Sequence, residues 1–116
     1  MSYTSSRLTT KNKGDWMQGK LEIRASLPIG IGTWPAIWML PTDWVYGGWP
    51  ESGEIDIMEH VGYNPNWIHG TIHTDEYNHM DGTQLGGQIH IDDVSSNFHT
   101  YSIEWTDEYI LSLIHI

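Results

Sequence analysis

The segment that most constrains this chain is Gly53-Glu54-Ile55-Asp56-Ile57-Met58-Glu59, in which three carboxylates are separated by apolar residues. On a β-strand successive side chains point to opposite faces, so Glu54 and Asp56 share one face. Strict alternation would send Glu59 to the other face, and one extra residue, most simply Met58 in a β-bulge, brings it back. The pattern therefore predicts three acids on one face of a half-buried strand, where crowded like charges must raise one pKa.

The rest of the chain predicts an all-β protein of one domain. Its 116 residues include 12 Gly and 5 Pro, which divide the sequence into short segments without a long helical repeat. We expect strands at residues 3–10, 19–27, 34–40, 53–59, 68–74, 88–91 and 99–106, with a long loop at 75–87. The run at 34–40 is apolar enough to suggest a strand buried on both faces. If 68–74 pairs antiparallel with the acidic strand, its polar face, which carries His73, lies beside the carboxylates.

Composition narrows the possible partners. The formal net charge is −10, which argues against a nucleic acid or an anionic membrane as partner, and no apolar run reaches transmembrane length. The 7 Trp and 6 Tyr suit a carbohydrate, whose rings stack on broad aromatic faces, although such residues also fill β cores. Cysteine is absent, so the chain has neither a disulfide framework nor a thiolate nucleophile.

Three interpretations of the acidic strand are open from the residues alone. A solvated acidic edge is one, but Ile55 and Ile57 place the strand over a core. A cation site is another, although Ca²⁺ sites usually draw their oxygen ligands from loops. The third is paired-carboxylate catalysis, since a retaining glycosidase needs two carboxyl groups about 5–5.5 Å apart. An aspartate between two glutamates would help to hold their pKa values apart.

The acidic segment resembles the signature of glycoside hydrolase family 16, and its Glu-x-Asp-x-x-Glu spacing is similar to that of the laminarinase branch. The likeness extends from about residue 3 to 109. Further matching motifs are Tyr3-Thr4-Ser5-Ser6-Arg7-Leu8, the strand around residues 19–24, Gly32-Thr33-Trp34-Pro35-Ala36-Ile37-Trp38-Met39-Leu40-Pro41, Trp49-Pro50, Gly70-Thr71-Ile72-His73 and Phe98-His99-Thr100-Tyr101-Ser102-Ile103-Glu104-Trp105.

This resemblance implies an antiparallel β-sandwich of the jelly-roll, concanavalin-like type that cleaves internal β-1,3-linkages of β-glucans with retention of configuration. It implies Glu54 as nucleophile, Glu59 as acid/base and Asp56 as assisting acid. It further implies that Trp49 stacks on a donor-side sugar and that Arg24 binds sugar hydroxyls from a neighbouring strand. The remaining candidates for substrate binding are Trp34, Trp38 and His73, the last beside the acid/base.

The same resemblance indicates a sandwich truncated at both ends. We expect residues 1–109 to be a partial catalytic domain and 110–116 an atypical apolar tail, a strand cut short or a non-native segment. The full-length protein is expected outside the cell or in the periplasm, although the polar start of this chain lacks an export signal. No cofactor or metal is implied, apart from a structural Ca²⁺ that the missing regions would hold, and the oligomeric state is not indicated.

Alternatives remain for the activity. Agarose, carrageenan or a mixed-linkage glucan would suit the bulged motif equally, although the 5 basic residues argue against a sulfated substrate. A module that binds β-glucan without cleaving it is the alternative of a different class. Retention of Glu54, Asp56 and Glu59 favours the enzyme.

Overall fold

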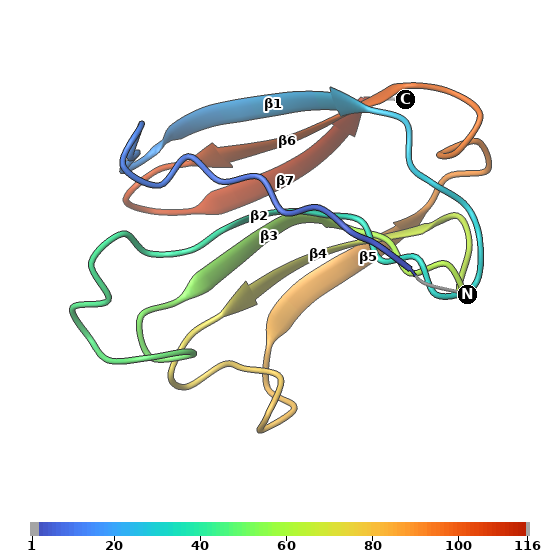
Figure 1. Cartoon of the computed structure of the whole chain (residues 1–116). Helices are drawn as coiled ribbons and strands as arrows, with labels where there is room; N and C mark the ends of the chain where they lie inside the picture. Colours follow the sequence, from blue (N-terminus) through green and yellow to red (C-terminus); the bar gives the residue numbers. More distant parts are fainter. Residues whose placement is uncertain (1–2, 116) are drawn as a thin grey trace.

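The computed structural model describes residues 3–115, which form two antiparallel sheets packed face to face (Figure 1). The three-stranded sheet has the order β1-β6-β7 and the four-stranded sheet the order β2-β3-β4-β5. The strands are β1 (Gly19–Ala25), β2 (Ala36–Met39), β3 (Glu54–Glu59), β4 (Trp67–His73), β5 (Leu85–His90), β6 (His99–Trp105) and β7 (Ile110–His115). The expected antiparallel β-sandwich is thus confirmed.

Apolar residues from both sheets meet between the layers. The buried cluster consists of Leu27, Met58, Ile68, Ile91, Val94 and Tyr101. Met58 and Ile68 come from the four-stranded sheet and Tyr101 from the three-stranded one, and each is at most 2% exposed. Because one face of each sheet is used for this core, the other face of the four-stranded sheet remains open to solvent.

Three segments differ from their sequence predictions, and a fourth, the terminal one, is a strand. Residues 3–10 form no strand, because their exposed backbone pairs with none of the described strands. Strand β2 is shorter than 34–40 and is not buried on both faces, because only its inner residues Ile37 and Met39 turn toward the core. Strand β5 begins at Leu85, three residues before the expected start. The terminal segment, expected as a cut strand or a non-native tail, pairs in register with β6 as β7.

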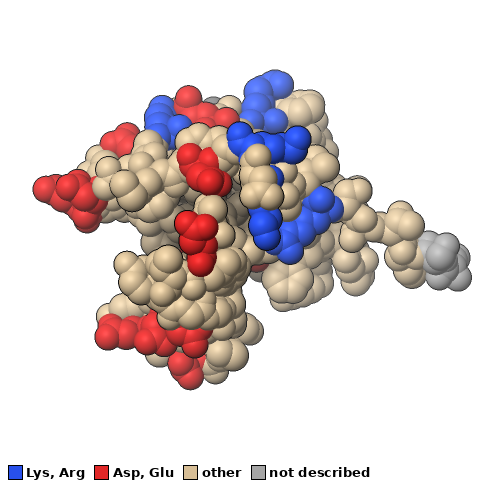
Figure 2. Space-filling view, turned by 60° about the vertical axis from the view of Figure 1, so that its left-hand side comes forward, with Lys and Arg blue, Asp and Glu red and all other residues tan. Residues whose placement is uncertain are grey.

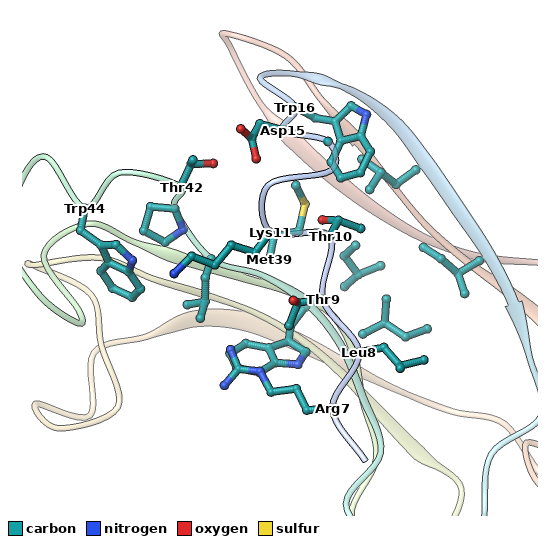
Figure 3. Close-up of a pocket in the computed structure, with 18 residues that line it drawn as sticks. Arg7, Leu8, Thr9, Thr10, Lys11, Asp15, Trp16, Met39, Thr42 and Trp44 are labelled. Carbon is teal, nitrogen blue, oxygen red and sulfur yellow. The ribbon is translucent and has the colours of Figure 1, made fainter.

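The N-terminal segment runs beside an opening of about 410 Å³ between the sheets (Figure 3). Leu8 and Thr9 line its outer side, and Ile23 of β1 and Ile57 of β3 line its inner side. None of the three carboxylates of β3 lines this opening. Its lining combines apolar strand residues with polar residues of the N-terminal segment, and it includes Trp38, the cross-strand partner of Asp56.

Charged side chains are unevenly placed on the surface (Figure 2). Asp and Glu side chains form several separate groups on the face shown, whereas Lys and Arg gather over one part of it. Across residues 3–115 the structure has no helix of the length and hydropathy needed to cross a membrane.

Candidate active site

A β-bulge in β3 places the three carboxylates on the open face of the four-stranded sheet. Asp56 is opposite Thr71 of β4 and Glu59 is opposite His69, so two residues of β3 face one residue of β4. The two bulged residues are Ile57 and Met58, which are 3% and 1% exposed. Both are buried on the core side, and the extra residue restores Glu59 to the face of Glu54 and Asp56, as predicted.

Asp56 occupies the centre of this row and is the carboxylate whose ionisation is most perturbed. Its pKa is raised to about 8, first by burial, then by the negative charges of Glu59 and Glu54, and finally by a hydrogen bond shared with Glu54. Loss of hydration and neighbouring like charges both disfavour the ionised form. At neutral pH Asp56 is therefore protonated, and its O–H is available to the Glu54 carboxylate.

His73, the last residue of β4, supports Asp56 from the neighbouring strand. Its Nε2 atom lies 3.2 Å from Oδ2 of Asp56, and the two side chains are 11% and 4% exposed. The His73 ring also packs against Trp49, with ring centroids 5.6 Å apart and planes inclined by 52°. His73 was predicted beside the acid/base candidate Glu59, but the register pairs it with Glu54, and His69 takes the place opposite Glu59.

Two tryptophans each donate a hydrogen bond to one of the outer glutamates. Nε1 of Trp49 lies 2.5 Å from Oε2 of Glu54, and Nε1 of Trp34 lies 3.0 Å from Oε1 of Glu59. Trp49 is 37% and Trp34 69% exposed, so their rings remain open to a ligand. Both predicted tryptophans are thus brought to the carboxylates, one at each end of the row.

Trp38 also reaches this face, because it pairs directly with Asp56 across β2 and β3. Its ring is 37% exposed and carries the guanidinium of Arg7 at 4.5 Å from the ring centroid. Arg7 was not among the predicted site residues. The only sequence signal for Arg7 as a site residue was its place in the Tyr3–Leu8 motif. The segment forms no strand, so side-chain alternation could not predict the direction of Arg7.

Arg24 does not join the site, which corrects its expected role. Strand β1 pairs with β6 in the three-stranded sheet and is not a neighbour of β3. The Arg24 guanidinium instead lies 4.5 Å from the centroid of the Phe98 ring. The alternation that placed Arg24 on a polar face was right, but that face belongs to the other sheet.

Polar residues that the sequence analysis did not single out as ligands extend the row across the sheet. His69 is opposite Glu59 on one side and Gln88 of β5 on the other, so the three side chains share one face. Among residues 3–115 no group of three or more His, Asp or Glu side chains is placed to hold a metal ion. The arrangement provides two flanked glutamates for acid–base or nucleophilic chemistry and several donors for hydroxyl groups.

Taken together, the fold and the site define an antiparallel β-sandwich that presents a bulged carboxylate strand, framed by tryptophans, on the open face of one sheet. The family model of glycosyl hydrolases family 16 matches residues 1–115. The chain belongs to this family.

Individual relatives agree with the family match. The chain is 59% identical over 110 residues to a β-glucanase of Rhodothermus marinus, covering 93% of this chain and 38% of the relative. It is 44% identical over 107 residues to a glucan endo-1,3-β-glucosidase of Cryptopygus antarcticus, covering 91% and 39%. The X-ray structure of the laminarinase from Rhodothermus marinus superposes with a TM-score of 0.88 at 55% identity, covering 90% of this chain and 43% of that one. The chain thus spans less than half the length of these relatives.

Proposed function

We propose that this chain is the catalytic segment of an endo-acting, retaining glycoside hydrolase that cleaves internal β-1,3-linkages of β-glucans. The observation that carries the proposal is the bulged row of Glu54, Asp56 and Glu59, with a tryptophan N–H on each outer glutamate. Paired carboxyl groups flanking a scissile bond are what retaining glycosidases use. The names of the two enzyme relatives support β-1,3-glucan as the substrate class.

The chemistry assigned to the row is a double displacement. The Glu54 carboxylate attacks the anomeric carbon while the Glu59 carboxyl gives its proton to the departing glycosidic oxygen. The Glu59 carboxylate then takes a proton from water, which attacks the same carbon and releases Glu54. Each of the two displacement steps inverts the configuration at the anomeric carbon. Two inversions restore the original configuration, so the overall reaction retains it.

The two glutamates need different environments for these roles. Glu54 receives the Trp49 N–H and the hydrogen bond shared with Asp56, and such donors stabilise an ionised carboxylate. Protonated Asp56 places one neutral carboxyl between the two glutamates and so limits their mutual repulsion. This division favours Glu54 as the nucleophile and leaves Glu59, at the other end, as the proton donor.

The exposed aromatic rings supply binding surface beside the row. We assign Trp49 to the donor-side sugar, because it borders Glu54, and Trp38 to the sugar above Asp56, because it pairs with that residue. Trp34 borders Glu59 and is placed to contact the sugar that leaves. Hydrolysis by two carboxylates needs no cofactor, and a polymeric glucan places the proposed activity outside the cell or in the periplasm.

The test is reducing-sugar release from soluble β-1,3-glucan by this chain and by the domain extended to the length of its relatives. We expect Glu54→Gln to reduce the rate by at least about 1000-fold, because the covalent step loses its nucleophile. The matched control is Glu51→Gln, since Glu51 is an exposed neighbour outside the row. Equal rates for the parent and Glu54→Gln would disprove the mechanism.

A substrate panel decides the polysaccharide, because the bulged strand alone does not. Agarose, carrageenan and a mixed-linkage glucan are compared with the β-1,3-glucan at equal mass concentration. Preference for one of the first three would replace the proposed substrate while leaving the carboxylate roles intact. Saturable binding of oligosaccharide without any turnover by the extended domain would instead indicate a glucan-binding module.

A further inference from the structure

Trp67 and His90 form an aromatic corner where β4 begins and β5 ends. The two residues are direct partners in the register of these strands. Their ring centroids lie 5.2 Å apart, and the ring planes are inclined by 70°, an edge-to-face arrangement. Strand β5 borders the sheet in the part of the chain that the structure describes, so the corner lies beside solvent (Figure 1).

The corner lies on the same face of the sheet as the carboxylates. Trp67 alternates with Ile68, which is 2% exposed and belongs to the core. Trp67 therefore points away from the core, on the face of His69, which is itself opposite Glu59. The ring of Trp67 is half-buried and the side chain of His90 is 46% exposed.

The register also fixes how far the corner is from the proposed proton donor. Glu59, His69 and Gln88 form one row across β3, β4 and β5. Trp67 and His90 form the next row on this face, two residues further along, which corresponds to about 7 Å. A distance of about 7 Å corresponds to roughly one or two sugar residues of a bound chain. The corner therefore lies one or two sugars beyond Glu59, on the side away from Trp49 and His73.

We propose that the Trp67–His90 corner is a sugar-binding position on the leaving-group side of the carboxylate row. This inference rests on the proposed function, because only the assignment of Glu59 as proton donor makes this the leaving-group side. The exposed face of the Trp67 indole stacks on the C–H face of a glucose ring. The His90 imidazole, with Nδ1 lying 3.4 Å from Oδ1 of Asp92, presents Nε2 to a hydroxyl group.

The ligand class follows from the chemistry along the path. The His69 imidazole and the Gln88 amide can exchange hydrogen bonds with hydroxyls, and both lie between Glu59 and the corner. The core does not need Trp67 in this position, because Ile68 and Ile91 beside the pair already fill the inner side. An aromatic platform behind polar groups fits an uncharged polysaccharide better than a peptide or an anionic polymer.

The experiment measures affinity for β-1,3-gluco-oligosaccharides in the Glu54→Gln background, so that turnover does not interfere. Calorimetric titration compares a disaccharide with a hexasaccharide for the parent, Trp67→Ala and Trp67→Phe. We expect Trp67→Ala to weaken hexasaccharide binding by about 2- to 10-fold, the range typical of one aromatic contact. Trp67→Phe keeps a stacking ring and should recover most of that loss. The matched control is Trp16→Ala, since Trp16 is 54% exposed and lies away from the carboxylate face.

The outcomes separate the two proposals. The corner is supported as a binding position if the gain in affinity from disaccharide to hexasaccharide is smaller in Trp67→Ala than in the parent. In that case Trp16→Ala should show the same gain as the parent. Equal hexasaccharide affinity for the parent and Trp67→Ala overturns it, and so does undetectable binding by the parent. Hydrolysis by Glu54→Gln in the turnover assay would overturn the proposed function instead, whatever the titrations show. Circular dichroism of each variant excludes unfolding as the cause of a loss.

Discussion

Asp56 and His73 meet across β3 and β4, where Nε2 of His73 lies 3.2 Å from Oδ2 of Asp56 and both side chains are nearly buried. This contact closes a ring of four residues. Trp49 donates to Glu54, Glu54 shares a hydrogen bond with Asp56, and the His73 ring packs back against Trp49. The nucleophile candidate is therefore held from two sides by groups that are themselves fixed, as a preorganised site requires.

Removing the His73 ring should loosen this arrangement. His73→Ala deprives buried Asp56 of a polar partner and Trp49 of its packing surface, so we expect the free energy of unfolding to fall by about 1–3 kcal/mol. Urea denaturation monitored by tryptophan fluorescence measures the change. The control is His79→Ala, because His79 is an exposed loop residue. Equal stabilities for the two variants would contradict a supporting role for His73.

The raised pKa of Asp56 predicts how stability changes with pH. The pKa of its carboxyl is about 8 in the folded protein, against an ordinary value of 3.8. The folded state binds this proton more tightly, so the associated stability is complete below pH 3.8 and is lost as pH rises toward about 8. We expect Asp56→Asn, which cannot ionise, to show a shallower decline of the unfolding free energy across this window.

Urea denaturation at several pH values in that window checks this expectation. Asp107→Asn is the matched control, because Asp107 is exposed in the turn before β7 and should leave the slope of the parent unchanged. Equal pH slopes for the parent and Asp56→Asn would show that Asp56 ionises normally. In the turnover assay the parent should also lose activity as pH approaches 8, because ionised Asp56 no longer donates to Glu54.

The placement of the carboxylates was predictable from the sequence because side-chain alternation is a local property. The spacing of Glu54, Asp56 and Glu59 required a bulge for one shared face, and the polar face of β4 followed from antiparallel pairing. The partner sheet of β1 was not predictable in this way. Alternation assigns Arg24 to a polar face but does not say which sheet that face belongs to.

Glycines caused a second kind of error. Gly86 and Gly87 resembled a loop, yet they lie inside β5, opposite Thr71 and Gly70 of β4. A Cβ atom at Gly86 would lie 2.7 Å from the carbonyl oxygen of Gly70, so this position excludes a side chain for reasons of close approach. Such an approach between strands depends on tertiary structure, and the local sequence pattern does not contain it.

The Trp49 hydrogen bond is expected to matter more for turnover than for stability. Trp49→Phe keeps an aromatic ring against His73 and removes only the N–H that Glu54 accepts. A hydrogen bond to a charged group contributes about 1.5–3 kcal/mol, so we expect kcat/KM to fall by about 10- to 100-fold. Trp16→Phe is the control outside the site. Unchanged turnover for Trp49→Phe would show that Glu54 is positioned without this donor.

The bulge itself makes the most specific prediction, which concerns the number of residues between Asp56 and Glu59. Deleting Met58 leaves Glu59 two positions after Asp56, so regular alternation keeps it on the outer face, opposite His69. Inserting one alanine after Met58 instead places Glu59 four positions after Asp56, on the same face but opposite Trp67, about 7 Å further from Glu54. The deletion should cost about 2–5 kcal/mol of stability, because Met58 fills the core, but should retain measurable hydrolysis. The insertion should abolish it. Activity assays beside urea denaturation compare the two variants, and equal inactivity of two folded proteins would show that the number of residues between Asp56 and Glu59 does not set the position of Glu59.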